Sequence, residues 1–271
     1  MYRLVSGGRH EGQDPYYREY RQTVAVVGCG GTGSLVAEGL CRLLLAYPTM
    51  RLLLLDHDRV EEHNLLRQAF YQGDVGRFKA EVLAGRLARR YGRPVGYSIQ
   101  MFEDNPYHRT LLQDVVIVIG CVDNPLARKA LAESVSDSMW WVDAGNSDVW
   151  GQVLIGNAPG PDSMQHAFVP DGEYCRRLPL PTIQRPELLL PAPPPVLPAG
   201  MDPDCAEAIA LGAQSPTINQ AMAALVLEVV HRLLLGTCPW MALYLDLERG
   251  ELRPVYATPQ EAARVMHLRP N

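Results

Sequence analysis

Short apolar runs alternate with amphipathic stretches through the first half of the chain. Runs of consecutive apolar residues predict buried strands at 24–28, 51–56, 95–99, 115–119 and 140–143. Between several of these runs, apolar positions recur at helical spacing, which predicts helices at 34–46, 77–91 and 125–135. This order predicts an α/β fold, a Rossmann-like and mostly parallel sheet with helices on both faces.

The pattern changes after residue 150. A strand predicted at 151–156 has no crossover helix before it, so we expect it to be antiparallel to its neighbour. Residues 159–203 are rich in proline, which lacks a backbone donor and fixes φ. We therefore expect this stretch to be an extended crossover segment rather than part of the core.

Two helices and a hairpin are predicted after the proline-rich segment. Proline at a helix start and glycine at a helix end place the helices at 204–211 and 217–235. Apolar runs at 242–247 and 252–257 predict an antiparallel hairpin. We thus divide the chain into an N-terminal extension (1–22), a Rossmann-like core (23–157), a proline-rich crossover segment (158–203) and C-terminal helices with a hairpin that complete the same domain (204–271).

Composition and charge narrow the class of protein. The 271 residues are 47% hydrophobic and 20% charged, which is typical of a globular protein. A formal net charge of −5 argues against nonspecific binding to nucleic acid. The polar N-terminus has no signal-peptide core, and no apolar run approaches the ~18 residues that span a bilayer, so we expect a cytoplasmic protein with no membrane partner. In that compartment the six cysteines are expected to be free thiols.

The first predicted strand runs into a glycine-rich loop. Gly28, Gly30 and Gly33 permit a tight turn, close approach of phosphate to the backbone and close helix–strand packing. The helix that follows directs its N-terminal amides toward an anion. This motif alone is weak, because many such loops bind dinucleotides. Gly31 and Ser34 extend it to GxGGxGS, and the loop predicts a nucleotide-binding role for the core.

Polar residues after the second strand make this prediction more specific. Asp56 ends that strand, where a carboxylate binds ribose hydroxyls whichever adenine nucleotide is present. Arginine offers a planar fork for phosphate and lysine a point charge. An Asp-x-Asp, an Asn-x-x-Arg-Gln and a lysine together predict a triphosphate site, formed by Asp58, Asn64, Arg67, Gln68 and Lys79.

A triphosphate site also needs a carboxylate for its metal. Asp123 follows the strand at 115–119, at the edge where open α/β sheets bind nucleotides, and we predict that it binds Mg²⁺. Taken singly, Arg67 is equally consistent with a surface arginine, Lys79 with a charge at a helix start and Asp123 with a helix cap. For Asp58 the alternative is a purely structural role. Their combined order and spacing favours the site. Asp143, at the end of the next strand, is interpreted as a strand-end cap rather than a second phosphate-side carboxylate.

With these motifs the chain resembles the ThiF/MoeB family, most closely over 24–87 and again over 115–153 and 205–235. The resemblance implies an enzyme that uses ATP and Mg²⁺ to adenylate a C-terminal carboxylate. The substrate it implies is a small ubiquitin-like protein that ends in glycine, and the assembly it implies is a homodimer. It also implies catalytic roles for Arg67, Lys79 and Asp123.

Among subfamilies, the chain is most similar to the ThiF-type protein of the PRTRC plasmid and mobile-element cassette. The length and the stretch 204–220 carry that similarity. These cassettes encode a small ubiquitin-like protein, which would be the natural substrate. Family dimers often place an N-terminal arginine in the partner's ATP site, and Arg3, Arg9, Arg18 and Arg21 all remain open for that role.

Two cysteines compete for a nucleophilic role. Cys205 lies in a Cys-x-x-Ala patch similar to the one in which several family members form a thioester with the activated acyl group. A position in the first turn of a predicted helix lowers a thiol pKa, whereas the acidic neighbours Asp204 and Glu207 disfavour a thiolate. A small buried residue at a helix start is the alternative for Cys205.

Cys175 is the other candidate, because two arginines follow it and would favour its thiolate. Many family members also hold a structural zinc with two CxxC pairs. This sequence has no CxxC, so we do not expect a four-cysteine zinc site. Cys29 and Cys121 are interpreted as packing residues.

Two other functions use the same features. An NAD-dependent oxidoreductase would share the glycine loop, but it would leave Asn64, Arg67 and Lys79 without a role. A noncatalytic adaptor subunit of an activating enzyme often loses its phosphate-binding basic residues, and here Arg67 and Lys79 are present. We therefore rank the activating enzyme first.

Overall fold

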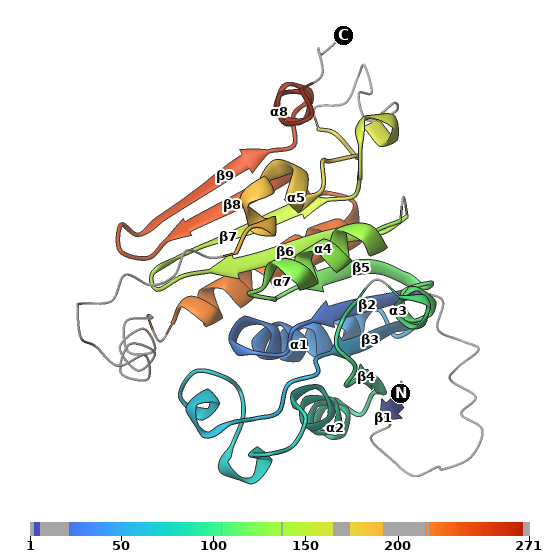
Figure 1. The fold of residues 1–271 in the computed structure, drawn as a ribbon, viewed down its shortest axis with the longest axis vertical. Helices are drawn as coiled ribbons and strands as arrows, with labels where there is room; N and C mark the ends of the chain where they lie inside the picture. The colour runs from blue at the N-terminus through green and yellow to red at the C-terminus, as the bar shows by residue number, and fades with distance from the viewer. Residues whose placement is uncertain are drawn as a thin grey trace.

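The structure, a computed structural model, describes residues 3–5, 22–103, 105–136, 138–164, 174–191, 215 and 217–267. One nine-stranded sheet runs through this part of the chain in the order β1-β4-β3-β2-β5-β6-β7-β8-β9 (Figure 1). The strands are β1 (Arg3–Val5), β2 (Gln22–Val27), β3 (Met50–Leu55), β4 (Val95–Ser98), β5 (Val115–Gly120), β6 (Trp140–Asn146), β7 (Trp150–Gly156), β8 (Trp240–Asp246) and β9 (Glu251–Tyr256).

The middle of the sheet is parallel and its two ends are antiparallel. Strands β4, β3, β2, β5 and β6 pair in parallel, as crossover helices require. Strand β1 is antiparallel to β4, and β7, β8 and β9 continue antiparallel from β6. The predicted Rossmann-like α/β fold with an antiparallel extension is therefore confirmed. The carboxyl ends of β2, β3 and β5 meet at one edge of the sheet.

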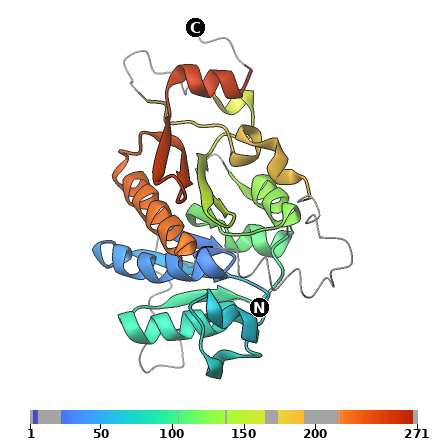
Figure 2. The same ribbon diagram turned by 90° about the vertical axis from the view of Figure 1, so that its left-hand side faces the viewer.

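Helices cover both faces of the sheet. Figure 2 shows α1 and α7 on one side of the strands and α4 and α5 on the other. The α-helices are α1 (Gly31–Leu43), α2 (Lys79–Tyr91), α3 (Pro106–Leu111), α4 (Pro125–Ser134), α5 (Pro181–Gln184), α7 (Ile218–Leu235) and α8 (Pro259–Val265). The 3₁₀ helices are η2 (Leu44–Ala46), η3 (Glu62–Leu66), η4 (Gln72–Asp74), η5 (Pro161–Met164) and η6 (Pro186–Leu189).

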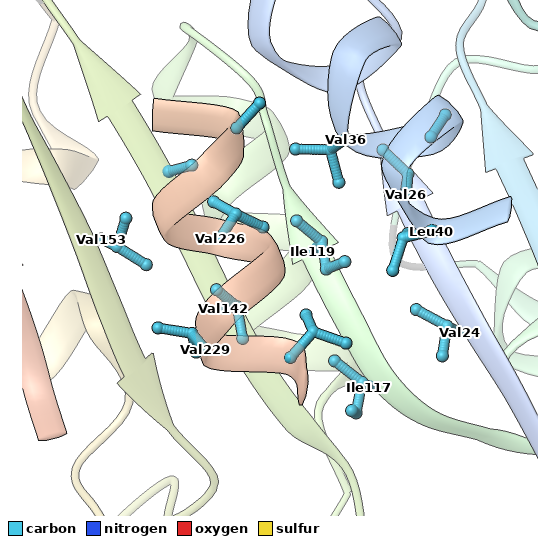
Figure 3. Close-up of a cluster of buried hydrophobic side chains, with 14 of the residues drawn as sticks. Val24, Val26, Val36, Leu40, Ile117, Ile119, Val142, Val153, Val226 and Val229 are labelled. Carbon is cyan, nitrogen blue, oxygen red and sulfur yellow. The ribbon is translucent and has the colours of Figure 1, made fainter. Parts of the chain in front are cut away.

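Strand alternation divides the core between these two faces. Val24 and Val26 of β2 join the cluster under α1 and α7, where Figure 3 shows them near Leu40. Ala25 and Val27 of the same strand point to the other face and join the cluster that includes residues of α4. Each such fully buried aliphatic side chain contributes about 1.5–3 kcal/mol. Because β2 is buried on both faces, its sequence is continuously apolar rather than alternating.

Helix α7 corrects one expectation from the sequence. By length and composition, among the described residues, this 18-residue helix with a mean hydropathy of 1.4 could cross a membrane. The expectation that no apolar run approaches that length was therefore wrong. In the fold α7 packs against α1, β6 and β7, and it buries Ile218, Met222, Val226 and Val229. A core helix meets the same test of length and composition.

Several boundaries also differ from those predicted. Asp143 is not at a strand end, because β6 continues to Asn146 and Asp143 pairs with Leu154 of β7. The short β1 and the helix α8 were not predicted at all. The helix predicted at 204–211 lies outside the described residues.

Candidate nucleotide-binding site

One large cavity opens at the carboxyl ends of β2, β3 and β5. Its volume is about 1130 Å³. Stretches that are far apart in the sequence line it together. Among the residues singled out from the sequence, those that line it are Gly28, Gly30, Gly31, Asp56, Asp58, Asn64, Arg67, Gln68, Lys79 and Asp123. The fold therefore brings together what the spacing of the motifs suggested.

The glycine loop has the backbone geometry of a close turn. Gly28 has φ of 87°, and a Cβ at this position would lie 2.4 Å from the Cys121 carbonyl oxygen. A Cβ at Gly33 would lie 1.9 Å from the Gly28 carbonyl oxygen. Gly33 is thus a packing residue behind the cavity rather than part of its lining. Gly30 is the N-cap of α1 and has no side chain to cover the first amides, so the positive end of the helix opens on the cavity.

Asp56 is fixed by backbone donors at the floor of the cavity. Its Oδ2 accepts from the N–H of Cys29 at 2.6 Å, and its Oδ1 accepts from the N–H of Asp58 at 2.8 Å. Burial raises the pKa of Asp56 above its ordinary value, and these two donors oppose that shift. The carboxylate therefore ties the glycine loop to the end of β3.

Asp58 and Lys79 form an ion pair in the cavity wall. Lys79 Nζ lies 3.1 Å from Asp58 Oδ2, and the Lys79 side chain is only 9% exposed while that of Asp58 is 51% exposed. The backbone reinforces the pair, because Lys79 N–H donates to the Asp58 carbonyl at 2.9 Å. Lys79 begins α2, so it is a buried cation held at a fixed place beside the cavity.

The loop that carries Arg67 is braced by Asn64. The Asn64 side-chain oxygen accepts from the N–H of Glu61 at 3.0 Å, which closes a capping box at the start of η3. Arg67 follows as the C-cap of that 3₁₀ helix, and both Arg67 and Gln68 line the cavity. Within the described ranges, the buried side-chain oxygen of Gln68 has no hydrogen-bond partner. Asn64 thus shapes the loop as well as lining the site.

Asp123 differs from the other carboxylates of the site. It is exposed at the cavity, and among the described residues it makes no hydrogen bond or ion pair. The neighbouring Asn124 is the N-cap of α4 and accepts from Ala127 N–H at 2.8 Å, so the alternative role of helix cap for Asp123 is excluded. Its carboxylate is available for a hard cation such as Mg²⁺.

A second cluster of possible metal ligands, at the end of β3, is less suited to a cation. Asp56, His57 and Asp58 present ligand atoms within 4.8 Å of one another. Asp56 already accepts two backbone N–H groups, and Asp58 already pairs with Lys79. A cation at this place would compete with those contacts, whereas Asp123 loses none.

The structure adds a buried ion pair that the sequence did not indicate. Arg128 of α4 lines the cavity, and its Nε lies 3.3 Å from both carboxylate oxygens of Asp143. Asp143 is fully buried, and burial raises its pKa to about 6 while Arg128 opposes the shift. Asp143 therefore holds Arg128 in place from behind the cavity wall.

The raised pKa of Asp143 predicts a pH-dependent stability. The native state keeps this proton between pH 3.8 and about 6, and the unfolded state does not. The stability of the wild type relative to Asp143→Asn should therefore fall as pH rises through that window, by at most about 3 kcal/mol, and then level off. Urea unfolding of both proteins from pH 4 to pH 7 measures the difference. Parallel pH profiles would contradict the assignment.

Three further polar residues lie where α1, β6 and α7 meet. Thr32 Oγ lies 3.1 Å from Asn146 Oδ1 and 3.1 Å from Asn219 Oδ1, and all three residues line the cavity. Sequence reasoning missed them. The available signal was an asparagine in the first turn of the largely apolar helix at 217–235.

The cysteines separate into different environments. Cys205 lies outside the described residues. Cys175 is 5% exposed, and burial raises the pKa of its thiol, so the expectation that two following arginines favour its thiolate was wrong. Cys29 is fully buried and Cys121 lines the cavity, and burial raises the pKa of both thiols. Among the described cysteines, none is poised as a thiolate.

The fold and the cavity define a nucleotide-binding α/β domain in which Arg67, Lys79 and Asp123 line the same cavity as the glycine loop. Comparison with known proteins gives the family: the ThiF family model matches residues 10–243, and the chain belongs to the ThiF family. It is 32% identical over 157 residues to ubiquitin-like modifier-activating enzyme 5 of Branchiostoma floridae, which covers 52% of this chain and 38% of the relative. The same enzyme of Bombyx mori is 32% identical over 145 residues, 49% of this chain and 36% of the relative. The chain thus spans less than half the length of these curated relatives.

Solved structures show the same fold at low identity. PaaA superimposes with a TM-score of 0.57 at 18% identity, over 89% of this chain and 75% of that chain. E. coli MccB crystallised with ATP superimposes with a TM-score of 0.54 at 19% identity, over 90% of this chain and 65% of that chain. These likenesses establish the architecture of the chain.

Proposed function

We propose that this protein is an ATP-dependent activating enzyme that adenylates the C-terminal carboxylate of a small ubiquitin-like protein. The observation that carries the proposal is the cavity in which the N-terminus of α1, Arg67, Lys79 and the exposed Asp123 meet. Membership of the ThiF family and the likeness to ubiquitin-like modifier-activating enzyme 5 support the same class of reaction.

The chemistry fits the charges of this cavity. In the proposed step a carboxylate oxygen of the substrate attacks the α-phosphorus of ATP, the bond from that phosphorus to the bridging oxygen breaks, and pyrophosphate leaves with both electrons. Negative charge develops on the phosphate oxygens and the leaving group. Arg67, Lys79 and the first amides of α1 are fixed cationic or dipolar groups that would stabilise it. Asp123 would hold the Mg²⁺ that neutralises the phosphates.

The cavity also has room for a peptide tail. Its volume of about 1130 Å³ lies above the roughly 300–1,000 Å³ that is typical of pockets for a single small molecule. Leu126 and Trp150 stand at its lining with 79% and 51% exposure. An apolar rim beside the phosphate groups supports an extended chain end that reaches the α-phosphate, such as one that ends in glycine.

The proposal has finer parts that extend beyond the described site. We propose that Cys205 then takes the acyl group as a thioester and releases AMP, and the burial of Cys175 favours Cys205 over it. The same proposal includes a homodimer, a cytoplasmic location and a ubiquitin-like partner from a PRTRC-type cassette. It also includes the four-part division of the chain. Among the N-terminal arginines, Arg3 lies in β1, and the other three lie outside the described residues.

Exchange of labelled pyrophosphate into ATP tests the adenylation step. With purified protein and a small ubiquitin-like protein encoded beside it, we expect exchange that requires the partner's C-terminal glycine. Absence of exchange, with NAD rather than ATP protecting against thermal unfolding, would favour the oxidoreductase. ATP protection without exchange by any tested partner would favour the adaptor. A covalent adduct with the partner that thiols cleave, and that is lost in Cys205→Ser but kept in Cys175→Ser, would assign the thioester to Cys205.

A further inference from the structure

Asn219 lies at the meeting point of three segments that are distant in sequence. It stands in the first turn of α7 and is 8% exposed, yet it lines the nucleotide cavity. Its Oδ1 lies 3.1 Å from Thr32 Oγ, and its Nδ2 donates to the Arg67 carbonyl oxygen at 3.4 Å. One carboxamide therefore contacts both the first turn of α1 and the loop that carries the Arg67 guanidinium.

The space beside Gly31 shows how closely this carboxamide approaches the glycine loop. A Cβ at Gly31 would lie 2.4 Å from Asn219 Nδ2 and 2.7 Å from Asn219 Cγ. Contacts under 3.0 Å force a shift of one partner, so a side chain at Gly31 would displace the Asn219 carboxamide from its present contacts. The glycine at position 31 therefore leaves room for a side chain that comes from α7.

We propose that Asn219 is a positioning residue for phosphate binding. It fixes the backbone of Arg67 against the first turn of α1, so that the guanidinium and the helix amides address the same phosphate group. The inference rests on the proposed function in taking ATP as the ligand, and it does not depend on the adenylation step. Nothing in the sequence motifs of the site assigned a role to this residue.

Two substitutions remove the link in different ways. Asn219→Ala removes both contacts, and Asn219→Asp keeps an acceptor for Thr32 but loses the donor to Arg67 and adds a negative charge near the phosphates. We expect affinity for ATP to fall about 10-fold in the first, which loses the hydrogen bond that positions Arg67, and about 100-fold in the second, which also adds a like charge near the phosphates. Gln220→Ala, an exposed neighbour on the same helix turn, is the matched control and should bind as the wild type does.

Adenosine separates positioning from a general structural effect. It fills the nucleoside part of the site but carries no phosphate, so its affinity should be the same in wild type and Asn219→Ala. A general loosening of the site would weaken ATP and adenosine alike, and that result would overturn the inference. Calorimetric titration of each variant with ATP, with adenosine and with tripolyphosphate gives the ratios directly.

A double-mutant cycle tests the contact with Gly31. Gly31→Ala should weaken ATP binding strongly in the wild type and much less in the Asn219→Ala background, because the carboxamide that meets the new Cβ is gone. Independent effects of the two substitutions would contradict the proposed contact. Suppose that the wild type catalyses partner-dependent exchange while Asn219→Ala keeps the wild-type ratio of ATP affinity to adenosine affinity. That result would overturn this inference but not the proposed function. A wild type that binds neither ATP nor tripolyphosphate would overturn it together with the proposed function.

Discussion

Replacing Asp123 with alanine is expected to lower partner-dependent exchange of pyrophosphate into ATP by about 100- to 1000-fold. The reason is that we find no structural role for this carboxylate in the part of the chain that the structure describes. It is exposed at the cavity, makes no hydrogen bond or ion pair among the described residues, and leaves the capping of α4 to Asn124. Its removal should therefore cost Mg²⁺ binding at the phosphates and leave the free energy of unfolding nearly unchanged.

Other carboxylates of the cavity are less able to replace it. Asp56 and Asp58 are engaged by backbone donors and by Lys79. A cation at Asp58 would compete with Lys79 for the carboxylate, and a cation at Asp56 would compete with the two backbone N–H donors. Asp123 is therefore favoured as the metal ligand by its place after β5 and because the contacts of Asp56 and Asp58 already engage their carboxylates.

The matched control is Glu133→Ala. Glu133 is another exposed carboxylate of the cavity rim, and it lies 3.9 Å from Lys129 in a surface pair of small energetic weight. Exchange should be unchanged in this variant. A titration with Mg²⁺ in Asp123→Ala should show a raised Mg²⁺ requirement. Exchange at the wild-type rate in Asp123→Ala would remove this residue from the metal site.

The part of the site that sequence predicted is the part governed by local rules. In a parallel sheet the carboxyl ends of neighbouring strands meet at one edge, so residues that follow β2, β3 and β5 must lie together. Gly28, Asp56 and Asp123 each follow one of these strands, and all three line the cavity. The strand and helix pattern alone was therefore enough to place them.

The part that sequence missed depends on contacts between distant elements. Arg128 and Asp143 pair across α4 and β6, and Asn219 reaches Arg67 from 152 residues away. No spacing rule links such positions, because the approach of α7 to the glycine loop depends on how the whole core packs. The expectation for Cys175 was wrong for a similar reason, because two neighbouring arginines in the sequence do not reveal that the thiol itself is buried.

Gly33→Ala is expected to destabilise the protein by about 3 kcal/mol or more and to abolish ATP binding. Alanine is about 1 kcal/mol better than glycine in the middle of a helix, so a glycine in the first turns of α1 needs a reason. The reason is steric, because the new Cβ would lie 1.9 Å from the Gly28 carbonyl oxygen and 2.9 Å from the Gly28 carbonyl carbon. Both are backbone atoms, and they cannot rotate away as a side chain does.

Gly85→Ala in α2 is the control that separates the steric effect at Gly33 from the effect of alanine on helix propensity. It makes the same chemical change inside a helix, but the nearest atom to the new Cβ is the end of the Arg89 side chain at 3.7 Å. This variant should gain about 0.5–1 kcal/mol from helix propensity alone and bind ATP as the wild type does. Chemical denaturation of the two variants compares the sign of the change in the free energy of unfolding, and calorimetry compares their affinities for ATP. A Gly33→Ala protein that is as stable as the wild type and still binds ATP would contradict this explanation. In that case α1 would not need to approach the turn at Gly28 closely. The close helix–strand contact could then not be what holds the amides of α1 at the phosphates.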